Sequence, residues 1–239
     1  MCTVTFLPAG NTIYLTSNRD EAAARKTANT PKVVAFSSGN MLFPKDNEAG
    51  GTWMAAHENG NAMVLLNGAF IKHHHNPPYR KSRGIIFLEV FNHNSPIEAY
   101  RHIDLIGIEP FTLIIWQGKQ LWECRWDQTA KHVTPIHANE PKIWSSVTLY
   151  DEAVRTKREI WFYKWLSMQT QITADAICQF HEFGGDGDSS TNLKMNRDGI
   201  LLTLSTTSIT INNTKAIMHY KDMQNGAITI AKLPINKSI

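Results

Sequence analysis

The sequence predicts an α+β fold in which antiparallel sheets are covered by helices. Three observations indicate it: hairpin signals dominate the first half of the chain, helical periodicity is concentrated in the middle, and strand patterns return near the C-terminal end. Many hairpins with a few helices between them are typical of this class. A chain of 239 residues is long enough to bury a substantial core. We expect a single domain over residues 1–239.

Two alternating segments and the turn between them predict the first hairpin. The segments are Thr3–Leu7 and Thr12–Thr16, and the turn is Pro8–Asn11. A loop of this length sets a register in which Phe6 lies opposite Ile13. The same register places Cys2 opposite Ser17, on the apolar face of the hairpin and close to Asn18–Glu21. A slip of one residue would move Cys2 to the other face.

Two further hairpins and four single strands are expected. Thr52–His57 and Ala62–Asn67 flank Asn59-Gly60, which is the strongest short turn signal, and this register places Asn67 opposite Thr52. The third hairpin pairs Phe111–Trp116 with Leu121–Trp126 around Gly118-Lys119. The single strands are Lys32–Ser37, Leu202–Ile211, Ala216–Tyr220 and Ala227–Leu233.

Four helices are expected in the middle of the chain. They are Gly84–Phe91, Pro96–His102, Asp151–Met168 and Thr173–Phe183. In the third, Val154, Trp161, Trp165 and Met168 recur at helical spacing, which predicts a buried stripe. Asp151 and Thr173 are the expected N-terminal caps, and Gly184-Gly185 is the expected stop.

Composition excludes several classes of protein. The formal net charge is only +3, and the longest basic cluster is Arg80–Arg83, whereas nucleic-acid-binding proteins gather basic residues on one face. Three widely separated cysteines argue against a disulfide framework and favour a reducing compartment. No secretory signal is recognised, and no apolar run reaches the roughly 18 residues of a membrane span. We expect a cytoplasmic protein with a small-molecule ligand or substrate, without nucleic-acid partners or membrane spans; its oligomeric state stays open.

Cys2 is the most interesting residue for chemistry. Removal of Met1 would leave a thiol and a free α-amine on the same residue. Because an α-amine has a pKa near 8, a useful fraction is neutral at pH 7 and can accept the thiol proton. The thiolate then attacks a carbonyl carbon. The alternative is an incidental buried cysteine at the end of a strand.

The segment Asn18-Arg19-Asp20-Glu21 follows the second strand directly. One interpretation is a helix start, because acids come first and Arg25-Lys26 come last, as the helix dipole favours. The other is a site beside the N-terminus. There a carboxylate could orient the α-amine, and an arginine near a thiol would lower the thiol pKa.

Several motifs together resemble one family. They are Met1-Cys2-Thr3, Asn18-Arg19-Asp20-Glu21, Gly50-Gly51-Thr52-Trp53, Asn67, Ser82-Arg83-Gly84 and Met195-Asn196-Arg197-Asp198-Gly199. In this order and spacing they are similar to the NRDE family, also called the Transport and Golgi organization protein two family. The resemblance extends over nearly the whole chain.

That family is in turn similar to the N-terminal nucleophile hydrolases, near the choloylglycine hydrolases and penicillin acylases. The resemblance implies a four-layer αββα sandwich of two antiparallel sheets. It also implies that Cys2 is the nucleophile, that Asp20 holds the nucleophile residue, and that Asn67 stabilises the tetrahedral intermediate. Asn18 and Arg19 complete the candidate catalytic set, and all four side chains are expected to gather around Cys2.

The chain departs from those hydrolases at three places. They carry Arg-Asn-x-Asp, whereas this chain has Ser17 at the arginine position and Arg19 directly before Asp20. Trp144-Ser145-Ser146 stands where a second asparagine is expected, and Ser205–Ser208 stands where a late arginine is expected. The fold is therefore expected to transfer further than the activity.

Two functions from different classes follow. The first is an N-terminal cysteine amidohydrolase that acts on a small amide or acylated compound and needs no cofactor. The second is a non-catalytic binding or trafficking protein on the same fold, with haem as its cofactor. One ground for this second function is the run His73-His74-His75, because imidazole ligates haem iron and other metals. The other ground is the family's link to intracellular haem handling. The alternative for this run is an exposed polar loop.

Overall fold

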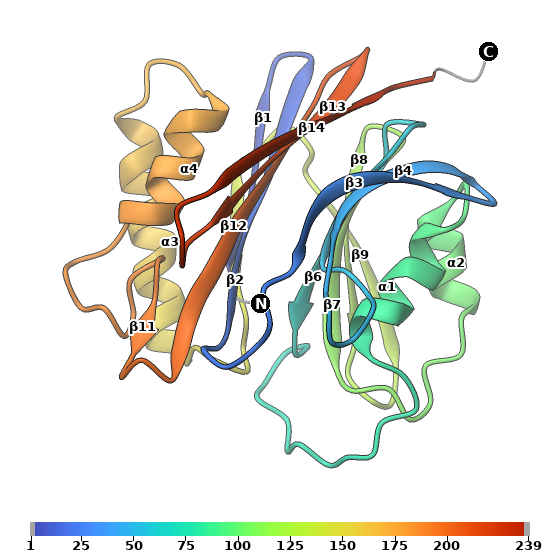
Figure 1. The fold of residues 1–239 in the computed structure, drawn as a ribbon, viewed down its shortest axis with the longest axis horizontal. Helices are drawn as coiled ribbons and strands as arrows, with labels where there is room; N and C mark the ends of the chain where they lie inside the picture. Colours follow the sequence, from blue (N-terminus) through green and yellow to red (C-terminus); the bar gives the residue numbers. More distant parts are fainter. Residues whose placement is uncertain (1–2, 237–239) are drawn as a thin grey trace.

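The protein, described by a computed structural model over residues 3–236, is a four-layer αββα sandwich (Figure 1). The sheet that contains the first strand, sheet 1, has the order β10-β1-β2-β12-β13-β14, and β11 pairs with β12. Its described strands are β1 (Thr3–Ala9), β2 (Thr12–Ala22), β10 (Lys142–Ser145), β11 (Asn196–Arg197), β12 (Leu201–Ile211), β13 (Lys215–Asp222) and β14 (Ile228–Pro234).

Sheet 2 runs in chain order from β3 to β9, with every neighbouring pair antiparallel. Its described strands are β3 (Asn29–Phe36), β4 (Gly39–Lys45), β5 (Met54–His57), β6 (Ala62–Asn67), β7 (Phe111–Gln117), β8 (Gln120–Trp126) and β9 (Lys131–Ile136). The predicted fold class, two antiparallel sheets face to face with helices outside, is confirmed.

Each sheet has its own pair of helices. The helices α1 (Arg83–Phe91) and α2 (Pro96–His102) pack on sheet 2, while α3 (Glu152–Ser167) and α4 (Ala174–Phe183) pack on sheet 1 (Figure 1). Asp151 and Thr173 cap α3 and α4 as predicted, since each side chain accepts a hydrogen bond from a backbone N–H of the first turn. None of the helices within residues 3–236 is long and apolar enough to cross a membrane.

The buried stripe predicted for α3 is partly wrong. Met168 is 64% exposed, and Trp161 and Trp165 are only half-buried, whereas Phe162 and Arg158 are fully buried. The error arises because hydropathy assigns an arginine to the solvent side, although a guanidinium with enough hydrogen-bond acceptors can be buried.

The register predicted for the first hairpin is wrong by two residues. The loop is only Gly10-Asn11, so Phe6 pairs with Leu15 and not with Ile13. A shift of two keeps every side chain on its predicted face, because the side-chain period of a strand is two. Ser17, the predicted partner of Cys2, pairs with Val4, and Cys2 itself lies outside the described residues.

The second hairpin is offset by one residue from the prediction. Met54 pairs with Val64 and Ala56 with Ala62, and the loop is closed by hydrogen bonds between His57 and the Gly60-Asn61 segment. A loop of this kind ends in a left-handed residue, and Gly60 has φ 87°. Continued along the chain, this register places Gly51 and not Thr52 across from Asn67. On its other side Asn67, at the end of β6, pairs with Phe111 of β7. The third hairpin has the predicted turn and pairing.

Four strands were not predicted: β4, β9, β10 and the two-residue strand β11. β9 and β10 are edge strands, and β9 contains Pro135, which an edge tolerates but a central strand does not. β4 contains Pro44, and its hairpin turn with β3 includes Gly39 at φ 129°. Such short or proline-containing segments carry too little alternation to be recognised from the sequence alone.

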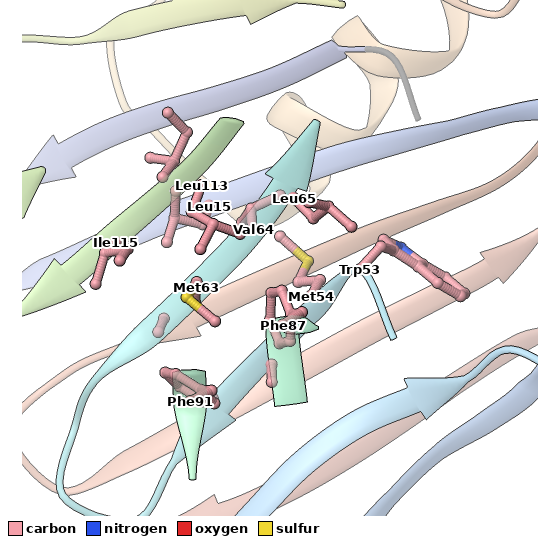
Figure 2. Close-up of a cluster of buried hydrophobic side chains, with 14 of the residues drawn as sticks. Leu15, Trp53, Met54, Met63, Val64, Leu65, Phe87, Phe91, Leu113 and Ile115 are labelled. Atoms are coloured by element: carbon pink, nitrogen blue, oxygen red, sulfur yellow. The ribbon is translucent and has the colours of Figure 1, made fainter. Parts of the chain in front are cut away.

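Most of the core lies between the two sheets and under α1. Phe6 of β1 contacts Trp116 of β7, with ring centroids 5.7 Å apart, and this contact spans the two sheets. Figure 2 shows Leu15 of β2 among side chains of sheet 2, with Phe87 and Phe91 of α1 at the same cluster. A smaller cluster around Phe162 and Phe180 joins α3 and α4 to sheet 1.

The segment before β5 approaches the first turn of α1 closely at Gly51. A Cβ atom added at Gly51 would lie 2.3 Å from the backbone carbon of Gly84. We expect Gly51→Ala to lower the free energy of unfolding by about 3 kcal/mol or more, because backbone atoms on both sides would have to separate.

The matched control for this close approach is Gly10→Ala. Gly10 has φ 60° and open space where its Cβ would stand, so the substitution costs only the left-handed conformation, about 1–2 kcal/mol. Urea unfolding of both variants measures the difference. Equal losses of unfolding free energy in the two variants would show that the close contact between Gly51 and Gly84 does not determine the cost of the substitution.

Candidate functional site

The polar end of β2 is buried and divides its side chains between two layers. Asn18, Arg19 and Asp20 are all at most 2% exposed. Successive residues of a strand point to opposite faces. Asn18 and Asp20 contact groups on the helix side of sheet 1, and Arg19 contacts groups of sheet 2. The helix-start interpretation of this segment is wrong, because β2 continues as far as Ala22.

Asn18 uses its whole amide to join four segments of the chain. Its Nδ2 donates to the carbonyl oxygens of His181 at 3.0 Å and Leu193 at 2.8 Å. Its Oδ1 accepts from the Thr206 hydroxyl at 2.8 Å and lies 3.1 Å from His181 Nδ1. These contacts leave Asn18 without a spare group for a ligand.

His181 is held as a neutral ring by the same network. Since Asn18 Oδ1 can only accept, His181 Nδ1 carries the proton, and Nε2 accepts from the Thr5 hydroxyl at 2.8 Å. Burial, with a smaller contribution from the positive charge of Arg158, lowers the pKa of His181 to about 3. The neutral tautomer therefore belongs to the folded structure over the physiological pH range.

Asp20 is bonded to two hydroxyl groups from distant parts of the chain. Tyr150 Oη donates to Asp20 Oδ2 at 2.8 Å, and the Thr203 hydroxyl donates to Asp20 Oδ1. A carboxylate that accepts such bonds at 2% exposure is fixed in place. Its strand, β2, lies directly beside β1 and pairs Asn18 with Thr3, the first described residue.

Arg158 of α3 is a site residue that the sequence analysis missed. It is fully buried, its guanidinium lies 3.6 Å from the ring centroid of Tyr150, and it donates to the Thr3 hydroxyl. It also donates to the carbonyl oxygens of Thr191 and Asn192. Its Thr3 contact anchors the start of β1. The only signal in the sequence is an arginine on the stripe that also carries Phe162, one turn along the helix.

Arg19 ties sheet 1 to sheet 2. Its Nη2 donates to Asp46 Oδ2 at 2.7 Å, and its guanidinium lies 4.9 Å from the ring centroid of Trp53. Arg25 shares the same carboxylate oxygen at 3.1 Å. Burial alone would raise the pKa of Asp46, but backbone N–H donors and the two arginines outweigh it and lower that pKa.

Asn67 stands at a cavity between the ends of the two sheets. Its carbonyl oxygen accepts from the Ser146 hydroxyl at 2.7 Å. The turn after Ser146 leads back to Tyr150, whose N–H donates to the Ser146 carbonyl oxygen. One short segment therefore links Asn67 of sheet 2 to Asp20 of sheet 1.

The cavity has a volume of about 260 Å³. Its walls include Asn67, Ser145, Ser146 and Trp144, and two of these, Ser145 and Trp144, pair with Thr3 and Val4 at the start of β1. A second cavity, of about 440 Å³, adjoins it and shares Val147 and Arg155. The candidate site therefore opens into a space that a small organic molecule could enter.

The predicted site residues thus fall into three groups. Asn18 and Asp20 lie together on the helix side, Arg19 lies on the opposite face of the same strand, and Asn67 lies on the other sheet. Cys2, around which they were expected to gather, lies outside the described residues. Of the other two cysteines, burial raises the pKa of Cys124 to about 12, and burial raises that of Cys178 to about 11.

The histidine run packs partly against an acid. His73 Nε2 and His75 Nδ1 lie 3.0 Å and 3.3 Å from Glu109 Oε1, and Arg83 Nη2 lies 3.0 Å from Glu109 Oε2. Between Thr3 and Asn236 no group of three or more His, Cys, Asp or Glu side chains is arranged to hold a metal ion. These contacts tie the loop that follows β6 to the segment before β7.

The buried neutral His181 predicts a pH dependence of stability. Its folded-state pKa lies below its ordinary value, so unfolding lets the ring take up a proton, and the free energy of unfolding falls from about pH 6.5 towards pH 3. One such group contributes a slope of up to about 1.4 kcal/mol per pH unit.

We therefore expect the destabilisation caused by His181→Gln to be largest at pH 7 and to shrink as the pH falls. Urea unfolding between pH 7 and pH 4 checks it. A difference between the two proteins that stays constant over this range would contradict the assignment.

Arg158 predicts a second measurable effect. Arg158→Met leaves buried oxygens without donors, so we expect a loss of about 3 kcal/mol in the free energy of unfolding. Lys157→Met is the control at the neighbouring position, where the exposed lysine Nζ lies 3.5 Å from Asp186 Oδ2. For this variant we expect the free energy of unfolding to fall by less than about 1 kcal/mol. Thermal and urea unfolding of both variants compare them, and similar losses would argue against a special role of Arg158.

Comparisons with known proteins agree with this architecture. A Caenorhabditis elegans N-acylethanolamine-hydrolyzing acid amidase ortholog is similar with a TM-score of 0.61 and 10% identity, over 87% of this chain and 92% of that one. Two variant forms of the conjugated bile acid hydrolase of Clostridium perfringens have TM-scores of 0.58 and 0.60, at 11% and 10% identity. Both cover 100% of this chain, and 99% and 98% of their own.

At such identities the likeness shows the fold alone, and it confirms the fold of the N-terminal nucleophile hydrolases. No curated protein sequence matches the chain. The model of the family described as Transport and Golgi organisation 2 matches residues 1–177, which is most of the 239 residues. The chain therefore belongs to the Transport and Golgi organisation 2 family, the NRDE family of the sequence analysis.

Proposed function

We propose that this protein is an N-terminal cysteine amidohydrolase that cleaves a small amide or acylated compound. The observation that carries the proposal is Asp20, a buried carboxylate held by Tyr150 and Thr203 on the strand beside β1. A fixed carboxylate on the strand beside the start of β1 is what an N-terminal nucleophile needs in order to orient its α-amine. The names of the similar structures, an acid amidase and a bile acid hydrolase, support the same class.

The reaction begins after removal of Met1. The neutral α-amine of Cys2 accepts the thiol proton, and the thiolate attacks the carbonyl carbon of the substrate. The C–N bond then breaks, and the leaving amine takes up the proton from the α-ammonium group. A water molecule, deprotonated by the same α-amine, hydrolyses the thioester and releases the acid. In this scheme Asn67 donates to the oxyanion of the tetrahedral intermediate.

Asp20 would act through the amine and not on the substrate. Its two hydroxyl donors hold it in one orientation, so it can accept a hydrogen bond from the α-ammonium. Arg19 and Asn18 are assigned to positioning, because Asp46 and the amide network already occupy their polar groups. In this proposal Asp20 acts on the nucleophile, whereas Asn18 and Arg19 hold the strand β2 in place.

The second candidate function, haem binding through His73–His75, has one supporting observation. The buried Nδ1 of His73 has no hydrogen-bond partner within residues 3–236. Glu109 lies against both His73 and His75, however, so haem would have to displace it to use the nitrogens that face it. We therefore rank this candidate second.

Thiol reactivity tests the nucleophile without a known substrate. Iodoacetamide at pH 7 should label Cys2 at least ten times faster than Cys124 or Cys178, because burial raises the pKa of both other thiols. Peptide mass spectrometry gives the three rates, and an intact mass shows whether Met1 is gone. Equally slow labelling of all three cysteines, with Met1 still attached, would contradict the assignment of Cys2 as the nucleophile.

Substitution of the nucleophile gives a complementary test. Cys2→Ala should abolish turnover of any amide substrate while the melting temperature stays within a few degrees, since alanine removes the attacking atom and little volume. Cys2→Ser should retain a small fraction of the wild-type turnover, because its hydroxyl can still attack but is harder to deprotonate than a thiol. Full activity of Cys2→Ala, measured as release of the free amine, would contradict the mechanism.

A further inference from the structure

Arg155 occupies the junction of the two cavities at the candidate site. It lines both of them, and it is half-buried in the second turn of α3. Its Nε donates weakly to the Asp151 carbonyl oxygen at 3.4 Å. Within residues 3–236 its two terminal amino groups have no hydrogen-bond or ion-pair partner. A guanidinium in a concave site with its fork unoccupied is available to a ligand.

Two lysines add to this positive charge. Lys142 lines the cavity of about 260 Å³ and lies 5.6 Å from the ring centroid of Trp144. Lys72 lines the adjoining cavity. Neither makes an ion pair with any residue between Thr3 and Asn236. These two lysines and Arg155 thus carry positive charge without an ion pair within residues 3–236, and the charge of Lys142 also helps to lower the pKa of Glu123.

Most of the acidic side chains around the cavities already have hydrogen-bond partners within the protein. Glu123 is bonded to Arg125 and to the indole N–H of Trp144, and although burial works to raise its pKa, these partners lower it. Asp151 caps α3. Glu159 lines the same cavity one turn after Arg155, and it is exposed to solvent. Over both linings, five basic side chains (Lys72, Arg125, Lys142, Arg155 and Arg197) outnumber three acidic ones (Glu123, Asp151 and Glu159), so the site favours an anion.

We propose that the substrate of this site is an amide that carries an anionic group close to the scissile bond, and that Arg155 recognises this group. The inference rests on the proposed function, and it narrows the substrate class from amides in general to acidic amides. Arg155 binds the anion through its free fork, and Lys142 and Lys72 add charge from either side.

The size and walls of the cavity limit where that group can be. Asn67, which is proposed to contact the reacting carbonyl, and Arg155 line one cavity of only about 260 Å³. The anion must therefore lie within a few bonds of the amide. Leu66, Ile143 and Trp144 supply apolar surface in the same cavity, which suits an acyl chain on the other side of the bond.

A matched pair of ligands tests this class directly. N-Octanoylglycine and N-octanoylethanolamine share the acyl chain and the amide, and they differ in a carboxylate against a hydroxyl. Binding to Cys2→Ala protein is measured by isothermal titration calorimetry, so that no turnover disturbs the equilibrium. We expect the glycine conjugate to bind at least ten times more tightly than the ethanolamide.

Variants of α3 assign the preference to Arg155. In the Cys2→Ala background, Arg155→Met should weaken binding of N-octanoylglycine at least tenfold and leave that of N-octanoylethanolamine within twofold. Arg155→Lys should keep part of the preference, because the charge remains without the fork. Lys157→Met, on the same helix but beside Asp186 and outside the cavity linings, should change neither affinity. Circular dichroism and thermal unfolding confirm that each variant is folded.

The outcomes separate this inference from the proposed function. Equal affinities for the two ligands, no binding of either, or a preference that survives Arg155→Met would overturn the inference. Turnover is measured separately on the wild-type protein with the same two amides. A binding preference without any hydrolysis would support the anion site and contradict the hydrolase proposal. Hydrolysis of both amides at equal kcat/KM would support the hydrolase proposal and contradict the anion site.

Discussion

The structure depends on one constraint: sheet 1 buries a row of polar side chains under its helices, and each of them must find a partner there. Asn18 alone satisfies two carbonyl oxygens and accepts from Thr206 and His181. An unpaired amide in this layer would cost about 1–3 kcal/mol. The positions of α4 and of the segment around Leu193 relative to β2 are therefore fixed by hydrogen-bond geometry as well as by apolar packing.

Charge within this layer is balanced over several residues. Arg158 is fully buried, and it stacks on the ring of Tyr150, whose hydroxyl donates to Asp20. The tyrosine thus stands between a buried cation and a buried anion. Such an arrangement stabilises both charges only while all three side chains keep their places. It also explains why a neutral His181 belongs in this layer, since a second cation beside Arg158 would be unfavourable.

The fold could be predicted from the sequence further than the site could. Turn signals such as Asn59-Gly60 and caps such as Asp151 are local, so the hairpins and the helix starts follow from a few residues. The registers were harder, because one loop residue more or less shifts the pairing while the alternation stays the same. Asp20 and Asn67 were recognised through a family resemblance. Arg158 and Tyr150 were not, since their importance arises from contacts across more than 100 positions of the chain, such as Tyr150 with Asp20 at a separation of 130 residues.

The alternation along β2 has a consequence for how such a chain evolves. Asn18 holds a helix layer, and Arg19 holds the opposite sheet through Asp46 and Trp53. Selection for a stable fold is by itself sufficient to retain these two residues. A descendant that lost the chemistry of its first residue would still carry most of the motif. Persistence of Asn18 and Arg19 in a lineage therefore reports on folding, and only the nucleophile and the groups that contact its substrate record whether catalysis was kept.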